Sequence, residues 1–223
     1  MGPVIGDILP LAIGIAVSPI PIIAAILMLL SPKAKGTSLG FLGGWVLGIA
    51  VAVVVFTLLG AIIPASDPDA SKPIAGVVKI LLGLGLLLLA WNNWRKRPAP
   101  GVEPPLPKWM GAIDSMTAVR GLLLGFVLSA VNPKNLLLAA GAGISVGTGG
   151  LNLGEQTIAI VIFVVLAACS VAVPVIAYLI AANKMAPLLD GLRGWLVHNN
   201  ATVMAVLLLV LGVALIGKGI GSF

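Results

Sequence analysis

The stretch VRGLLLGFVLSAVNPKNLLLAAGAGI, residues 119–144, is long and apolar enough to cross a membrane, yet Asn132-Pro133-Lys134 lies near its middle. A proline inside a helix removes a backbone donor and clashes with the preceding turn. In hydrocarbon, such a break is tolerated only where the freed groups are buried in protein or line a wet cavity. A lysine beside the break costs about 2.5–3.5 kcal/mol on insertion scales, so its position requires a specific reason.

A second apolar stretch, residues 8–30, is interrupted at a comparable depth by Ser18-Pro19-Ile20-Pro21. We therefore expect Pro19 and Pro21 to break the first membrane helix as Pro133 breaks the fourth. Broken helices at corresponding places in two halves of a chain are the usual sign of a transporter's binding site. The pattern indicates a transporter.

The composition supports a membrane protein with several crossings. Of the 223 residues, 60% are hydrophobic and only 9% are charged, and the mean hydropathy is +1.18. A soluble domain would carry about 25% charged residues. The net charge is +6, but the basic residues lie in short loops between apolar runs, a pattern typical of topology signals. Nucleic acid is therefore not expected as a partner.

The apolar runs predict an all-α integral membrane fold with six transmembrane helices. The runs are residues 8–30, 39–63, 74–91, 119–144, 155–182 and 202–220. We interpret the chain as a single transmembrane domain: a first three-helix repeat (1–91), an inside loop with an interfacial helix (92–118) and a second three-helix repeat (119–223). Three helices per half require the two repeats to be inverted, and both proline breaks then approach the midplane.

Lysine and arginine predict the orientation. With the N-terminus outside, nine basic residues fall on the inner side: Lys33, Lys35, Arg95, Lys96, Arg97, Lys108, Arg120, Lys184 and Arg193. Only three fall on the outer side: Lys72, Lys79 and Lys218. This asymmetry follows the positive-inside rule, so both termini are expected outside.

The second predicted helix carries Gly40, Gly44 and Gly48 at a spacing of four, which gives it one smooth face. Such a face lets another helix backbone approach closely. The partner is either another helix of the same chain or a second copy in a homodimer. We favour packing within the chain.

Lys134 is the first candidate for binding chemistry. The acidic residues all fall in predicted loops or at helix ends, so none is an evident partner: Asp7, Asp67, Asp69, Glu103, Asp114, Glu155 and Asp190. Three outcomes remain open. The ammonium pairs with an anionic substrate, rests on carbonyls exposed by the broken helices, or loses its proton through desolvation. The alternative to a binding role is a lysine that caps the C-terminal end of a half-helix.

Asn132 and Asn135 add amide groups beside Lys134, and Ser18 adds a hydroxyl from the other half of the chain. Together they form a cationic, hydrogen-bonding spot that suits an amphiphile with an anionic or sugar-like head. It does not suit a metal, because no carboxylate, histidine or cysteine cluster accompanies it. No nucleophile–base pair is visible in the membrane runs, so we expect neither an enzyme nor a cofactor. Asn200-Ala201-Thr202 matches the glycosylation pattern but falls on the predicted inner side.

Several uncommon runs resemble the actinobacterial GAP family, within the lysine-exporter superfamily. They are LPLAIGIAVSPIPIIAAILMLLSP (9–32), GFLGGWVLGIAV (40–51), LPKWMGAIDS (106–115), VNPKNLLLAAGAG (131–143) and NNATVMAVLLLVLGVALIGKG (199–219). The resemblance implies six helices in two repeats and export across the plasma (inner) membrane. Relatives are associated with moving glycopeptidolipids or sulfolipids to the mycobacterial cell surface, and the wider superfamily exports amino acids and ions.

On this chain the two proline motifs of that group fall on Ser18, Pro19 and Pro21 and on Asn132, Pro133 and Lys134. In the glycolipid-addressing branch the first motif is closer to Asn-Pro, so the resemblance leaves the substrate open. Our leading hypothesis is a secondary transporter that exports an amphiphilic lipid. The alternatives are an exporter of small solutes such as amino acids or ions, and a non-transporting accessory subunit of a cell-envelope lipid export assembly.

Overall fold

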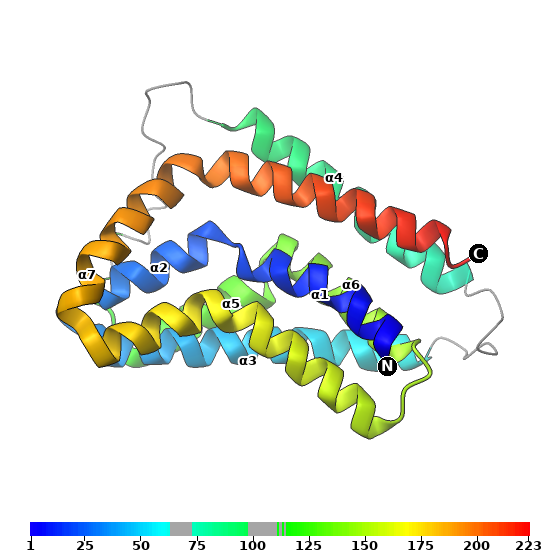
Figure 1. Cartoon of the computed structure of the whole chain (residues 1–223), viewed down its shortest axis with the longest axis horizontal. Coiled ribbons are helices and arrows are strands. Elements are labelled where there is room, and N and C mark those ends of the chain that lie inside the picture. Colours follow the sequence, from blue (N-terminus) through cyan, green and yellow to red (C-terminus); the bar gives the residue numbers. More distant parts are fainter. Residues whose placement is uncertain (63–72, 98–110, 112, 114) are drawn as a thin grey trace.

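The computed structural model describes residues 1–62, 73–97, 111, 113 and 115–223, and every regular element in these ranges is a helix. The all-α class predicted from the sequence is confirmed. The interfacial helix predicted within residues 92–118 falls largely outside the described residues. Figure 1 shows an elongated molecule in which the helices run mostly along the long axis, with both chain ends toward the same end.

The first apolar run is divided into α1 (Gly2–Ala16) and α2 (Pro19–Leu29), which meet at 50°. Pro19 has no N–H to continue the ladder of α1, but its fixed φ suits the first position of α2. Pro21 lies within the first turn of α2, where a missing donor is also tolerated. The predicted break between residues 16 and 19 is therefore present.

The fourth run is divided in the same way, into α5 (Ala118–Ala130) and α6 (Pro133–Gly147), which meet at 63°. Pro133 begins α6 as Pro19 begins α2. Asn132 caps α6, because its side-chain oxygen accepts a hydrogen bond from the backbone amide of Lys134 at 3.1 Å. Both breaks thus follow one rule: a helix stops before a proline, and that proline starts the next helix.

Three longer helices complete the described chain: α3 (Ala34–Ile62), α4 (Pro73–Arg95) and α7 (Leu153–Ile220). Each is long and apolar enough to cross a membrane, which gives three candidate spans, or five if each bent pair counts as one. α7 contains both of the last two predicted runs. Its 68 residues include a kink at Ala181, whose dihedral angles are non-helical (φ −142°, ψ 56°). α7 therefore consists of two helices that meet one residue before the end of the fifth predicted run. Figure 1 shows α7 bending sharply on itself at the end opposite the termini.

The glycine face predicted on α3 lies against α5 within the same chain. A Cβ at Gly40 or Gly44 would collide with the carbonyl of Ala118 or Leu122, and one at Gly48 with the Ser129 hydroxyl. α5 has its own close contacts at Gly121 and Gly125, which face Thr37 and Phe41. Such mutual approach of small residues favours backbone contact in a membrane, where burial alone gives little drive.

A second glycine-lined contact joins α4 to the C-terminal part of α7, and the two lie side by side in Figure 1. A Cβ at Gly83 would come within 2.8 Å of the Gly212 carbonyl, and one at Gly76 within 2.8 Å of the Gly219 carbonyl. Between these two helix pairs, α1 contacts α6 and α7, while α2 contacts α7 and α3. α1, α2 and α6 therefore lie inside the bundle, where the groups freed at the two breaks find protein partners.

Substitution of Gly44 tests the α3–α5 contact. Gly44→Ala places a methyl group against the Leu122 carbonyl and should lower thermal stability by about 1–3 kcal/mol, the usual cost of overpacking. Gly43→Ala, one position away, has nothing within 4 Å of the added Cβ. It should leave stability unchanged or slightly higher. Thermal unfolding of both purified variants in one detergent checks this, and equal midpoints would contradict the contact.

Candidate functional site at the two helix breaks

The two breaks meet through the side chain of Lys134, the second residue of α6. Its ammonium donates to the backbone carbonyl of Gly14, near the end of α1, at 2.8 Å. It also donates to the hydroxyl of Ser18, the residue between α1 and α2. One side chain thus ties the second break to the first across more than 110 residues of sequence.

The Gly14 carbonyl is available because α1 ends at a proline. In a continuing helix it would accept from the amide of Ser18. Here the Ser18 amide donates instead to Ile15 at 3.2 Å, because Pro19 has no N–H to offer Ile15. The Gly14 carbonyl would lack a donor in hydrocarbon, and the Lys134 ammonium supplies one. The negative end of the α1 dipole adds a favourable field for this cation.

At the second break, an asparagine side chain likewise supplies a donor to a carbonyl that has lost its helical partner. In an unbroken helix the carbonyl of Leu128 would accept from the amide of Asn132. Instead, it accepts from the side-chain amide of Asn135 at 3.0 Å. Asn135 is almost fully buried, and its own side-chain oxygen has no partner among the described residues.

Lys134 and Ser18 are both buried, at 6% and 3% exposed. No ion pair of Lys134 with a carboxylate is present in the described part of the chain. Its charge is therefore balanced only by a carbonyl, a hydroxyl and the end of a helix. A buried ammonium has three donors, and two of them are used here.

A cavity of about 150 Å³ lies beside Lys134. Its walls come from both breaks, from the C-terminal end of α4 and from the C-terminal part of α7. The lining residues are Ser18, Pro19, Ile20, Pro21, Leu89, Asn93, Asn132, Pro133, Lys134, Asn200, Met204 and Leu208. This volume is sufficient for several water molecules or a small polar group.

The comparisons with known proteins give one result. The family model described as Sap, sulfolipid-1-addressing protein, matches residues 8–221. The chain belongs to the sulfolipid-1-addressing protein family. This confirms the family-level resemblance drawn from the sequence. Neither a comparison with curated proteins nor one with solved structures gave a match.

In this member of the sulfolipid-1-addressing family, the structure brings Lys134, Asn132 and Ser18 together at the cavity. Asn135 is adjacent to them in sequence, but its amide serves the Leu128 carbonyl. Two further asparagines line the same cavity, Asn93 from α4 and Asn200 from α7. The Asn93 amide donates to the Leu89 carbonyl at 2.8 Å. The side-chain oxygen of Asn200 is buried without a partner among the described residues.

Sequence reasoning missed Asn93 and Asn200 for a physical reason. Each lies at the border of an apolar run, where amides are common, and only the arrangement of α4 and α7 turns both toward the breaks. Asn200 carried a usable signal, since it belongs to a glycosylation pattern on the side where glycosylation is not expected.

Substitution of Asn135 tests whether its side-chain amide is needed to satisfy the carbonyl freed at the second break. Asn135→Ala should leave the Leu128 carbonyl without a donor and lower stability by about 1–3 kcal/mol. The matched control is Asn199→Ala, because Asn199 donates to the Trp195 carbonyl at 2.9 Å within the continuous helix α7. That carbonyl keeps its backbone donor, so stability should change little. Thermal unfolding of both variants measures the two effects. If Asn135→Ala lowers stability as little as Asn199→Ala does, Asn135 is not needed to satisfy the Leu128 carbonyl.

Proposed function

We propose that this chain is a plasma-membrane secondary transporter that exports an amphiphile with an anionic or glycosylated head group. The observation that carries the proposal is Lys134, a buried lysine without a carboxylate partner among the described residues, at the meeting point of two broken helices and in the wall of a cavity. An intramembrane cation in this setting indicates a substrate pathway. The family's name points to a sulfolipid, whose sulfate would supply the missing anion.

The ammonium of Lys134 is the group that binds the anionic head. Two of its three donors hold the Gly14 carbonyl and the Ser18 hydroxyl, and the third serves an anion in the cavity. A charged acceptor forms a stronger hydrogen bond than a neutral carbonyl or hydroxyl. An anion therefore competes with Gly14 and Ser18 for the lysine and loosens the link between the two breaks. Asn132 and Asn200 offer amides to hydroxyl groups of the same head.

The small cavity sets how an amphiphile would be handled. Because about 150 Å³ is below the 300–1,000 Å³ of drug-sized sites, only the head group enters. The acyl chains remain in the bilayer beside the helices, whose outer faces are apolar. No aqueous path for the chains is then required.

The proposal uses six crossings in two inverted repeats. At 1.5 Å per residue the 68 residues of α7 amount to about 100 Å, more than three times a bilayer core of about 30 Å. We assign two crossings to α7, before and after its bend. The contacts support interlocked repeats, because α3 packs on α5 and α6 while α7 packs on α1 and α2. Alternating access is then a rocking of one repeat against the other.

Protease protection tests this topology. Tags at both termini should be cleaved from outside intact cells. A tag inserted after Gly101, within the inside loop predicted from the sequence, should be cleaved only after the cells are opened. The prediction follows from the positive-inside distribution of lysine and arginine. Opposite sidedness of the two termini would exclude an even number of crossings.

Substitution of Lys134 tests the substrate site. Lys134→Met keeps most of the side-chain volume but removes the charge, and it should abolish export while the protein still inserts. Lys134→Arg keeps a charge and should retain part of the activity. The measurement is the surface level of the exported lipid at matched protein abundance. Full export by Lys134→Met would reject the assignment.

A second candidate is favoured by the size of the cavity itself. A volume of about 150 Å³ suits a small solute such as an amino acid or an ion better than it suits a lipid. Mass spectrometry of lipids retained by the purified protein separates the two candidates. A retained anionic lipid that Lys134→Met loses supports lipid export, whereas saturable uptake of a water-soluble solute into inverted vesicles supports the second.

A further inference from the structure

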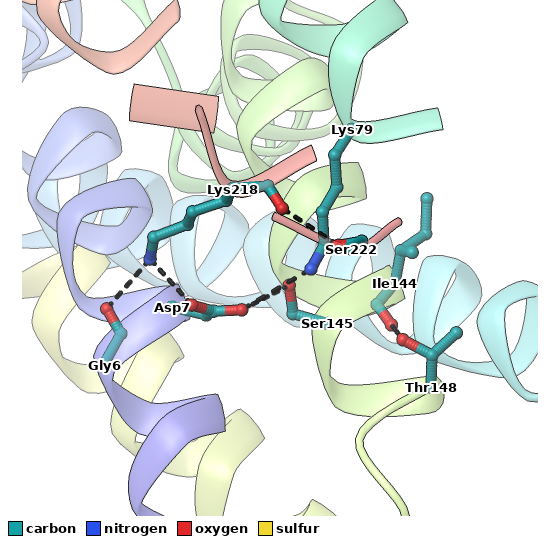
Figure 2. Close-up of polar contacts among 8 residues, drawn as sticks. All are labelled: Gly6, Asp7, Lys79, Ile144, Ser145, Thr148, Lys218 and Ser222. Carbon is teal, nitrogen blue, oxygen red and sulfur yellow. Dashed lines mark hydrogen bonds and ion pairs between the residues drawn. The ribbon is translucent and has the colours of Figure 1, made fainter. Parts of the chain in front are cut away.

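A charged cluster lies at the end of the bundle that carries the chain termini (Figures 1 and 2). Asp7, in the second turn of α1, accepts from the ammonium of Lys218 at 2.8 Å through Oδ1. Its Oδ2 is 3.6 Å from the ammonium of Lys79 and accepts from the hydroxyl of Ser145 at 3.5 Å. The cluster joins four helices, because Lys79 lies on α4, Ser145 on α6 and Lys218 on α7.

The backbone of α1 contributes to the same cluster. Pro10 lies inside α1 and has no N–H, so the carbonyl of Gly6 loses its helical partner. The ammonium of Lys218 donates to this carbonyl at 3.2 Å. Lys218 therefore holds α1 through both a carboxylate and a freed carbonyl, as Lys134 holds the other end of α1 through Gly14 and Ser18.

The charges in this cluster are not balanced. Two ammonium groups share one carboxylate, and Lys79 is 8% exposed although its Asp7 contact is longer than a charge-assisted hydrogen bond of about 2.7–2.9 Å. Asp7 and Lys218 keep about a third of their side-chain surface accessible. An ion pair that is partly accessible to water costs less to separate than a fully buried one. The cluster can hold helices together and can also release them.

The cavity beside Lys134 lies away from this cluster. On α4 the nearest residue of the cavity wall is Leu89, which is 10 residues, or about 15 Å, from Lys79. Between cavity and cluster the interior is filled by apolar side chains. Leu11 and Leu215 lie against Gly141, and Leu138 and Leu211 lie against Gly14.

We propose that the cluster of Asp7, Lys79 and Lys218 is the exit gate of the transport path, which closes the outer end of the bundle while the cavity is loaded from the inner side. The inference rests on the proposed transport function and orientation. Alternating access requires one end to be closed whenever the other is open. Here the closed end is fastened by ion pairs between α1 and α4 and between α1 and α7, and opening it requires Asp7 to leave the two lysines.

Thiol accessibility measures the state of this gate without any transport. The lone cysteine, Cys169, is exposed and is first replaced by serine. Leu11, one helical turn deeper than Asp7 and 3% exposed, becomes the reporter as Leu11→Cys. A membrane-impermeant maleimide added outside intact cells should label this reporter poorly while the gate is intact.

Asp7→Asn removes the shared carboxylate and should raise external labelling of the reporter several-fold. Exchanging the charges, with Asp7→Lys and Lys218→Asp together, should return labelling part of the way to the starting level. The ion pair between α1 and α7 is restored, but Lys79 then faces a second lysine. The matched control is Asp190→Asn, which removes the exposed pair of Asp190 with Arg193 at 2.9 Å on α7. It should leave labelling unchanged.

Several results would overturn the gate. Strong external labelling with Asp7 intact would show an open path. Unchanged labelling in Asp7→Asn and in the milder Lys218→Gln, with both proteins folded, would show that the cluster only stabilises the bundle. If Asp7→Asn does not accumulate, Lys218→Gln carries the test alone. Labelling that appears only in inverted vesicles would place the cluster on the inner side.

The experiments can reject the exit gate and the proposed transport function independently of each other. Loss of export in Lys134→Met together with unresponsive labelling would reject the gate and keep the transporter. Responsive labelling together with full export by Lys134→Met would keep a closable path and reject Lys134 as its substrate site.

Discussion

A carbonyl freed by a proline in the interior of a bilayer must find its donor within the protein, because lipid offers none. This constraint organises the described structure. The Gly14 carbonyl on α1 loses its helical partner before Pro19 and accepts from Lys134, which reaches in from α6. Leu128 at the second break accepts from Asn135. The polar side chains at the two breaks therefore serve first to satisfy the carbonyls that have lost their helical donors.

The same side chains also form the candidate binding site. A lysine that must hold a neutral carbonyl in an apolar interior keeps its charge unbalanced, and an anion is a better partner than the group it already holds. Under the proposed function, the geometry that stabilises the protein is also the geometry that binds the anion. Asparagines from α4, α6 and α7 surround the position, so elements from both halves of the chain contribute to one small cavity.

The sequence predicted the features that follow from local rules. Pro19 and Pro133 each begin a new helix, as predicted, and a lysine beside such a break needs polar partners nearby. Proline alone does not decide the outcome, because Pro10 and Pro187 lie inside helices. The hydroxyl of Ser18 was predicted as one of the partners of the lysine, and carbonyls exposed by the broken helices were left open as another. The sequence could not single out Gly14, because a glycine has no side chain to indicate that its carbonyl is free. Asp7 was assigned to a helix end without a role, since only the arrangement of α4 and α7 brings Lys79 and Lys218 to it. The kink of α7 at Ala181 agrees with the predicted end of the fifth run at residue 182. The helical conformation of the stretch from Asn183 to Pro187 was not predicted, because both residues are typical of a loop.

The missing N–H of Pro10 bears on how α1 could move. A helix with every ladder bond in place behaves as a stiff rod, and displacing one end displaces the other by a comparable amount. α1 lacks one rung between Gly6 and Pro10, and a lysine from outside the helix satisfies that carbonyl. The hydrogen-bond ladder of α1 is therefore interrupted between the Asp7 end of the helix and the end that leads to Ser18. Under the proposed transport function, this missing rung is the point at which we expect the Ser18 end of α1 to bend relative to the Asp7 end.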